Sequence, residues 1–276
     1  MIASFFVKIS LNENVESNKN LSILASRTSE LSKKMNYIKA FLLLLLISSC
    51  QITETININP DGSGTIEVFQ LRDENNYMQL GRPYSDSEKF VDTIFVFQDY
   101  ITKYAATFAK FNKSDQALFQ EHANVKMHIK VDPVQMENFN LISSDFKKIE
   151  EIPNVYESLS LSNSLKENYP VLKESFKIKY TFDGFTFKRN LVIVDQQKFD
   201  KDKKMLEERK KMYAKYKLAQ SFSLKYHFPR EIKSVSNEKA VISSDKKTMT
   251  LEFQLSDCLE NPEITNLEVV LESGSN

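Results

Sequence analysis

The chain has 276 residues, and its 37 Lys and Arg balance 37 Asp and Glu, so the formal net charge is zero. This balance gives no reason to expect binding to nucleic acid, which requires a basic face, and the low count of five glycines argues against a loop that cradles phosphate. With only two cysteines, we expect an apolar core rather than disulfides to hold the fold.

Residues 35–50, MNYIKAFLLLLLISSC, have the features of a secretory signal. Lys39 supplies a basic head, residues 41–47 are apolar without interruption, and Ser48 and Ser49 are small. The apolar run is shorter than the roughly 20 residues that cross a bilayer. The sequence predicts a signal peptide over residues 35–49, with cleavage after Ser49; a buried apolar strand is the alternative.

The ending Ile47-Ser48-Ser49-Cys50 resembles the lipobox of bacterial lipoproteins. The resemblance implies a diacylglycerol on the Cys50 sulfur and an acyl chain, such as palmitate, on the new amino terminus. Several acyl chains hold a protein on a membrane far more firmly than one does. In lipoproteins of this kind an Asp at the position of Gln51 can favour retention in the inner membrane, and a dense acidic run after the cysteine is linked to surface display in Bacteroidetes. This chain has neither, so the resemblance implies the outer membrane, facing the periplasm. An ordinary signal peptide with a chance cysteine is the other interpretation.

The rest of the chain divides around this signal. Residues 1–34 are polar, and we interpret them as an upstream mis-start or a disordered extension. Residues 50–276 are long enough for a substantial core, and we expect one mature domain. The polar tail leaves the lipid as the expected membrane attachment.

The mature chain opens with two alternating runs around Pro60-Asp61-Gly62, which predict a β-hairpin over 53–71. The same turn partly matches an EF-hand loop, but Asn57 stands at its first position and Val68 at its twelfth, where acidic ligands are needed. We interpret it as a hairpin and expect no metal site.

A long amphipathic helix is predicted over 85–111, after the capping box that begins at Ser85. Its apolar residues recur every three or four positions. Core packing is one role for this stripe, and a face toward a bound lipid is the other. The candidate ligand-facing residues are Phe90, Ile94, Phe97, Ile101, Tyr104 and Phe108.

Further elements follow from the same rules. Alternation predicts strands over 125–131, 222–226, 240–242, 248–255 and 266–272, and a second hairpin over 175–194. Helical spacing after Asp132-Pro133 predicts a helix over 139–149, and the Ser-rich stretch 156–170 suggests a loop. Residues 195–219 predict a charged helix, which would either be solvated or meet anionic headgroups.

No motif in the sequence names a reaction. The three histidines form no zinc pattern, and Ser244-x-x-Lys247 lies in a predicted turn rather than at a helix start. We therefore predict no catalytic residue and no cofactor.

Two stretches carry a resemblance to a domain family. The Asn-Pro-Asp-Gly-Ser-Gly turn and the closing run from Phe228-Pro229 to Leu255 resemble small envelope lipoproteins of the LppM type. The resemblance implies a domain related to lipid-binding folds.

The sequence predicts an α+β fold with a curved, mainly antiparallel sheet of hairpins and the helices 85–111 and 195–219. The leading hypothesis is a non-catalytic, lipid-anchored envelope protein that binds a lipid or another apolar ligand between helix and sheet. The alternatives are an assembly component that docks another envelope protein and, less favoured, an envelope hydrolase.

Overall fold

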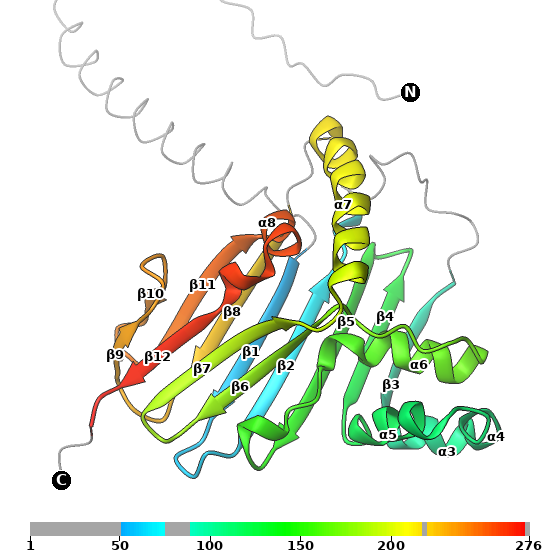
Figure 1. Ribbon diagram of the computed structural model, residues 1–276, viewed down its shortest axis with the longest axis horizontal. Helices are drawn as coiled ribbons and strands as arrows, with labels where there is room; N and C mark the ends of the chain where they lie inside the picture. Colours follow the sequence, from blue (N-terminus) through cyan, green and yellow to red (C-terminus); the bar gives the residue numbers. More distant parts are fainter. Residues whose placement is uncertain (1–50, 75–88, 217–219, 274–276) are drawn as a thin grey trace, which may run out of the picture. The chain divides into compact units, whose positions relative to one another are not determined.

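The computed structural model describes residues 51–74, 89–216 and 220–273. They form two sheets with helices beside them, and all strand pairs except β1 with β8 are antiparallel, so the predicted mainly antiparallel α+β class is confirmed (Figure 1). In spatial order the eight-stranded sheet contains β10 (Val241–Ile242), β11 (Thr248–Gln254), β8 (Ser221–His227), β1 (Gln51–Ile58), β2 (Gly64–Leu71), β5 (Glu137–Phe146), β4 (Lys126–Asp132) and β3 (Val91–Val96). The four-stranded sheet contains β6 (Phe176–Phe182), β7 (Thr186–Ile193), β12 (Leu267–Leu271) and β9 (Ile232–Val235).

The inner face of the large sheet is covered by two different partners. The small sheet packs over β1 and β8, where Phe187 of β7 meets Tyr226 of β8 with ring centroids 5.2 Å apart. Helices cover the β3–β5 half, where Phe97 stacks on Phe119 (Figure 1). The helical elements are α3 (Phe97–Lys103), α4 (Ala105–Phe108), α5 (Lys113–Glu121), α6 (Ser158–Glu167), α7 (Gln196–Tyr216), α8 (Leu255–Glu260), η1 (Ile149–Glu151), η2 (Val155–Glu157) and η3 (Pro262–Thr265).

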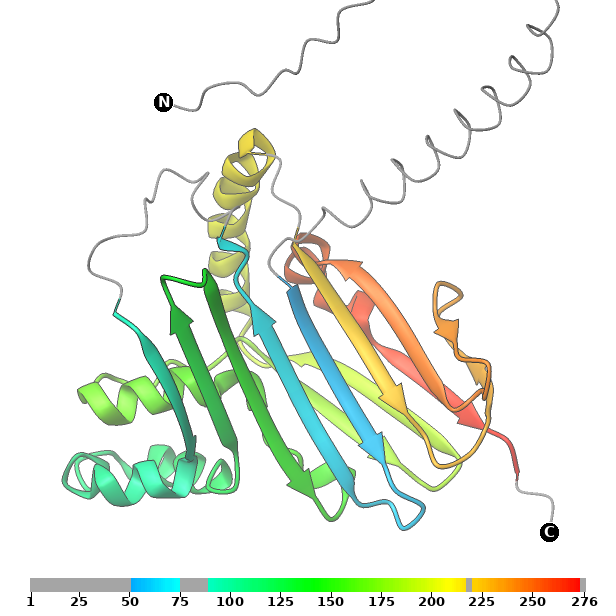
Figure 2. The ribbon, with the colours of Figure 1, turned by 180° about the vertical axis from the view of Figure 1, so that it is seen from behind.

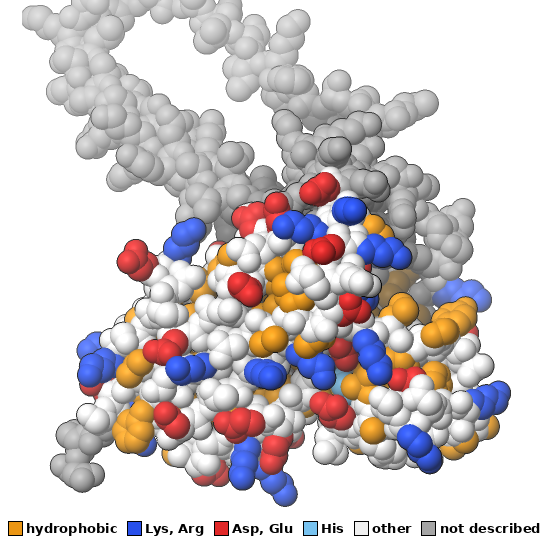
Figure 3. Space-filling view, in the orientation of Figure 1, with side chains coloured by type: hydrophobic (Ala, Val, Ile, Leu, Met, Phe, Trp, Pro, Cys, Tyr) orange, Lys and Arg blue, Asp and Glu red, His pale blue; other side chains and the backbone are white. Residues whose placement is uncertain are grey.

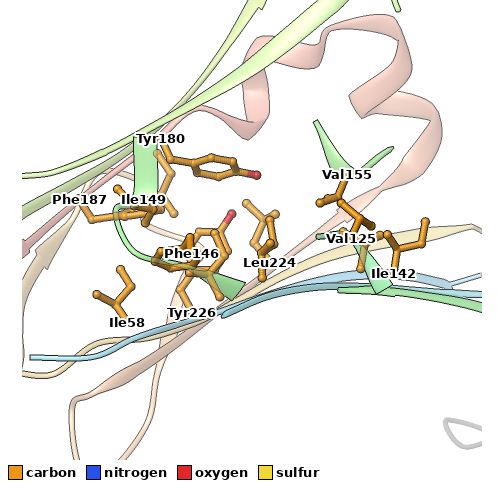
Figure 4. Close-up of a cluster of buried hydrophobic side chains, with 14 of the residues drawn as sticks. Ile58, Val125, Ile142, Phe146, Ile149, Val155, Tyr180, Phe187, Leu224 and Tyr226 are labelled. Atoms are coloured by element: carbon orange, nitrogen blue, oxygen red, sulfur yellow. The ribbon is translucent and has the colours of Figure 1, made fainter. Parts of the chain in front are cut away.

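Alternating apolar residues build the core between these layers. Ile56, Ile66 and Leu224 point inward from neighbouring strands and are fully buried. Figure 4 shows Tyr180 and Tyr226 entering this core from opposite layers. The other face of the large sheet carries no helix among the described residues (Figure 2).

Both predicted hairpins are confirmed, as β1–β2 and β6–β7. In the first turn the Asp61 carboxylate accepts hydrogen bonds from the backbone N–H and the hydroxyl of Ser63. Gly62 has a φ of 82°, a conformation that glycine adopts without strain. Asp61, Gly62 and Ser63 therefore stabilise the turn that joins β1 and β2.

The predicted helix over 85–111 is wrong. Residues 75–88 lie outside the described part, and 91–96 form the strand β3, which pairs with β4 from Val91–Val131 to Val96–Lys126. The β-branched residues of this segment favour a strand, and pairing with β4 outweighs the helical spacing. Helical structure begins only at Phe97 and is divided between α3 and α4.

Two middle segments also differ from prediction. The expected helix at 139–149 is mostly β5, because its backbone pairs with both β2 and β4. Asp132 does cap backbone donors, those of Val134 and Gln135, but in the β4–β5 turn rather than at a helix start. The expected loop at 156–170 contains α6, whose Leu161 and Leu165 bury one face.

The predicted charged helix over 195–219 is confirmed as α7, with residues 217–219 outside the described part. The predicted strands appear as β4, β8, β10, β11 and β12. No helix in the described ranges is both long and apolar enough to cross a membrane.

Candidate functional site

A cavity of about 440 Å³ lies between the two sheets, where α7 and α8 approach each other. This volume falls within the roughly 300–1,000 Å³ of small-molecule sites. Its walls are mainly apolar. They include Ile52, Ile178, Leu191, Phe199, Phe222 and Leu255, which come from β1, β6, β7, α7, β8 and α8.

Buried polar groups form the deep wall of the cavity. Arg189 of β7 is 1% exposed, and its Nε lies 3.1 Å from Oε1 of Glu54 of β1, which is fully buried. A second guanidinium nitrogen lies 3.3 Å from the other Glu54 oxygen. The remaining terminal nitrogen donates to the hydroxyl and the carbonyl of Thr265, at 2.6 and 3.2 Å. The positive charge of Arg189 is thus paired with the Glu54 carboxylate inside the protein.

Three tyrosines complete the shell of Glu54. The hydroxyls of Tyr156, Tyr180 and Tyr226 all donate to its carboxylate, with Tyr180 at 3.0 Å from Oε1. Burial and the nearby carboxylate raise the pKa of each tyrosine well above its usual range, so the hydroxyls keep their protons.

The charge state of the central pair follows from the same contacts. Burial alone would raise the pKa of Glu54, but the charge and hydrogen bonds of Arg189, with the tyrosine hydroxyls, lower it overall. Burial likewise opposes the charge of Arg189, but Glu54 raises its pKa well above the usual value. The pair is therefore ionised, and it joins the two sheets through a satisfied polar network.

Charged side chains mark the mouth of the cavity, where Lys198 and Asp202 of α7 are about a third exposed. Lys198 donates to Asp202 over 2.7 Å, and the Ser175 hydroxyl lies 3.5 Å from the same carboxylate. Burial raises the pKa of Glu174 beside them. Figure 3 shows hydrophobic side chains gathered between α8 and α7 on this face.

Cys258 of α8 also lines the cavity. Burial raises the pKa of its thiol to about 12, so the thiol is neutral and behaves as an apolar group.

The predicted ligand-facing stripe does not line this cavity. Phe97 and Ile101 are buried in the core, Tyr104 and Phe108 are half-buried, and Phe90 and Ile94 are exposed. The structure therefore separates these six residues instead of placing them on one helical face. Cys50 and Ser49 lie outside the described residues.

The sequence did carry a signal for the buried network. Glu54 is in phase with Ile56 and Ile58, and Arg189 is in phase with Phe187 and Leu191. A charged residue at an inward position of an alternating strand requires a partner. The inward positions of Glu54 and Arg189 thus indicated that each charge is paired in the core.

The histidines are distributed away from the cavity. His122 contacts the Leu118 carbonyl, His128 pairs with Asp92, and His227 contacts the Thr248 hydroxyl. Within the described residues, no three His, Cys, Asp or Glu side chains are grouped to hold a metal ion.

Comparison with known proteins finds a similar solved structure but no matching family. No protein-family model matches the chain, and no curated protein matches it. The folded domain of the Mycobacterium tuberculosis protein LppM, solved by NMR, aligns with a TM-score of 0.35 and 9% identity. The alignment covers 82% of this chain and 91% of that domain.

Proposed function

We propose that this chain is a lipid-anchored cell-envelope protein that binds an apolar ligand, without catalysis, in the cavity between the sheets. The proposed site differs from the one expected from the sequence, because α7, α8 and both sheets supply its walls. The anchor is the lipid proposed at Cys50, and the proposed location is the outer membrane facing the periplasm.

One observation carries the proposal: the cavity is apolar, and its one deep cation is already neutralised. Arg189 donates hydrogen bonds to Glu54 and Thr265, and the Glu54 carboxylate neutralises its charge. An anionic group that bound Arg189 would have to break that network, whereas an apolar chain would only displace water from Ile178, Leu191 and their neighbours.

Mass spectrometry of the full chain, purified gently from membranes, tests both parts. The intact mass should show acyl groups that are lost in a Cys50→Ala variant. Organic extraction should release a ligand in stoichiometric amount. An unmodified mass would contradict the anchor. An empty wild-type extract would contradict the binding function, unless the acyl chain on Cys50 itself fills the cavity.

A matched pair of variants locates the ligand. Ile178 faces the cavity, whereas the next residue of β6, Lys179, is exposed on the opposite face. Ile178→Trp should fill the cavity and reduce the amount of extracted ligand, and Lys179→Trp should leave it unchanged. Circular dichroism checks that both variants fold.

A second candidate function is docking of another envelope protein on the uncovered face of the large sheet (Figure 2). Ile94 is 59% exposed there, and the ring centroids of Phe69 and Phe139 are 5.5 Å apart. Reproducible co-purification of one protein that Ile94→Lys abolishes, together with an empty cavity, would favour this function.

A further inference from the structure

One end of the eight-stranded sheet is defined by the first residue of β1. Gln51 pairs with Leu71, the last residue of β2, and with Ser221, the first residue of β8. Ser221 in turn pairs with Gln254, the last residue of β11. We call this end, marked by Gln51, Leu71, Ser221 and Gln254, the anchor end, because Cys50 is bonded directly to Gln51.

The cavity lies at the anchor end. Ile52 and Phe222, each one residue inside the sheet, line it, and α8 follows directly after Gln254 and adds Leu259. Cys50 stands two positions before Ile52 in the sequence, and consecutive Cα atoms are about 3.8 Å apart. A lipid on the Cys50 sulfur would therefore be attached close to the cavity wall. We infer that the anchor end lies on the bilayer with the cavity mouth facing it, and that the ligand is an acyl chain that enters from that bilayer. This inference rests on the proposed lipidation of Cys50 and on the proposed apolar cavity site.

Exposed apolar side chains at the same end support contact with a membrane. Strand pairing from β2 through β5 and β4 to β3 places two more features at the anchor end. They are the β4–β5 turn and the start of β3, where Val91 pairs with Val131. In that turn Val134 is 92% exposed, and Phe90, just before β3, is 63% exposed. Single exposed apolar residues are ordinary on protein surfaces. Here they share one end with the proposed lipid and with Leu259, which is 44% exposed at the cavity.

The charged helix α7 also supports this orientation. Figures 1 and 2 both show α7 extending past the anchor end of the sheet. Residues 201–211 hold six Lys or Arg and three Asp or Glu. Basic segments held close to a bilayer are attracted to anionic headgroups, so this composition favours the same orientation.

The absence of tryptophan from the sequence makes the orientation measurable. Each introduced tryptophan is the only one in the chain. The lipidated full chain would be reconstituted into vesicles of phosphatidylethanolamine and phosphatidylglycerol, with or without phosphatidylcholine brominated in its acyl chains. Val134→Trp reports on the anchor end. Phe185→Trp is the control, because Phe185 is 47% exposed in the β6–β7 turn, at the opposite end (Figure 1).

The bromines should quench Val134→Trp fluorescence and leave Phe185→Trp unchanged. Equal quenching, no quenching of either variant, or stronger quenching of Phe185→Trp would overturn the inference, and a ligand found by extraction would still support the proposed function. Val134→Trp quenching with an empty cavity would instead overturn the ligand assignment and the proposed function together.

The source of the acyl chain is a separate arm of the test. A chain from a free bilayer lipid is released by organic solvent, whereas a chain on Cys50 stays with the protein. A stoichiometric extracted lipid supports the first source. An empty extract overturns the binding function unless the Cys50 chain itself occupies the cavity. That case is shown when removal of the lipid by Cys50→Ala opens Cys258 to a thiol reagent.

Discussion

Glu54 of β1 and Arg189 of β7 lie 135 positions apart in the chain, yet they form an ion pair with an Nε to Oε1 distance of 3.1 Å between the two sheets. Both side chains are shut off from solvent, and three tyrosine hydroxyls occupy the remaining carboxylate positions. Arg189 and Tyr156 of this network line the cavity, and the ion pair joins its two layers.

Removing one partner of this pair should destabilise the protein strongly. Glu54→Gln or Arg189→Met leaves the other group buried without its counter-charge, which typically costs about 3–5 kcal/mol. The double variant Glu54→Gln/Arg189→Met should recover part of that loss, because it buries no charge and keeps an amide oxygen that can accept from the tyrosine hydroxyls. Unfolding free energies from urea titration test this, and additive effects of the two single changes would contradict it.

The Tyr180 hydroxyl should contribute measurably through its bond to the Glu54 carboxylate. Hydrogen bonds to charged groups contribute about 1.5–3 kcal/mol, so Tyr180→Phe should lower the unfolding free energy by that amount. Tyr169→Phe, at a position 62% exposed, is the matched control and should change little. Equal effects of the two changes would contradict the network.

Acid should weaken the wild-type protein more steeply than Glu54→Gln. The pKa of Glu54 is lowered in the folded state from an ordinary value of 4.5. Its ionised form therefore stabilises the fold above pH 4.5, and this contribution is lost as the pH falls through the folded-state pKa. Stability measured across the acid range should show a steeper decline for wild type below pH 4.5 than for Glu54→Gln. Parallel curves would contradict this assignment.

Cys258 should react slowly with iodoacetamide in the folded protein. Its pKa is raised from 9.0 to about 12, so the thiolate fraction falls about a thousandfold near neutral pH. The rate should rise by about that factor in concentrated urea. Cys258→Ser is the blank, and it also shows whether Cys50 carries a free thiol. A folded rate within tenfold of the unfolded one would show that the cavity wall is open.

Glu174 should make ligand binding depend on pH. Burial already raises its pKa at the cavity mouth. A neutral apolar ligand that covers the mouth would bury it further and raise the pKa again. Binding should then tighten as the pH falls through the range just above its ordinary value of 4.5. Titration with a fluorescent neutral acyl probe measures this, and Glu174→Gln should remove the dependence. A pH dependence that survives in Glu174→Gln would assign it to another group.

The sequence by itself determined the local elements whose pattern and end signals agree. Alternation and a turn built on Asp61 and Gly62 predicted the first hairpin, and Asp183-Gly184 predicted the second, because strand period and turn chemistry act over a few residues. The export signal and the Cys50 anchor are also sequence predictions, and they lie outside the described residues.

Only the tertiary structure decided the remaining features. Residues 91–96 and 139–146 show helical spacing, but they form strands because β4 and β2 offer them backbone partners from elsewhere in the chain. The site depends on the same kind of distant contact. Glu54, Tyr180, Arg189 and Tyr226 meet only when two sheets stack, and the cavity exists only where α7 and α8 close over them. Local periodicity marks Glu54 and Arg189 as inward-facing, but it carries no information on which distant segments pack together. Neither the partners within the network nor the cavity could therefore be predicted from it.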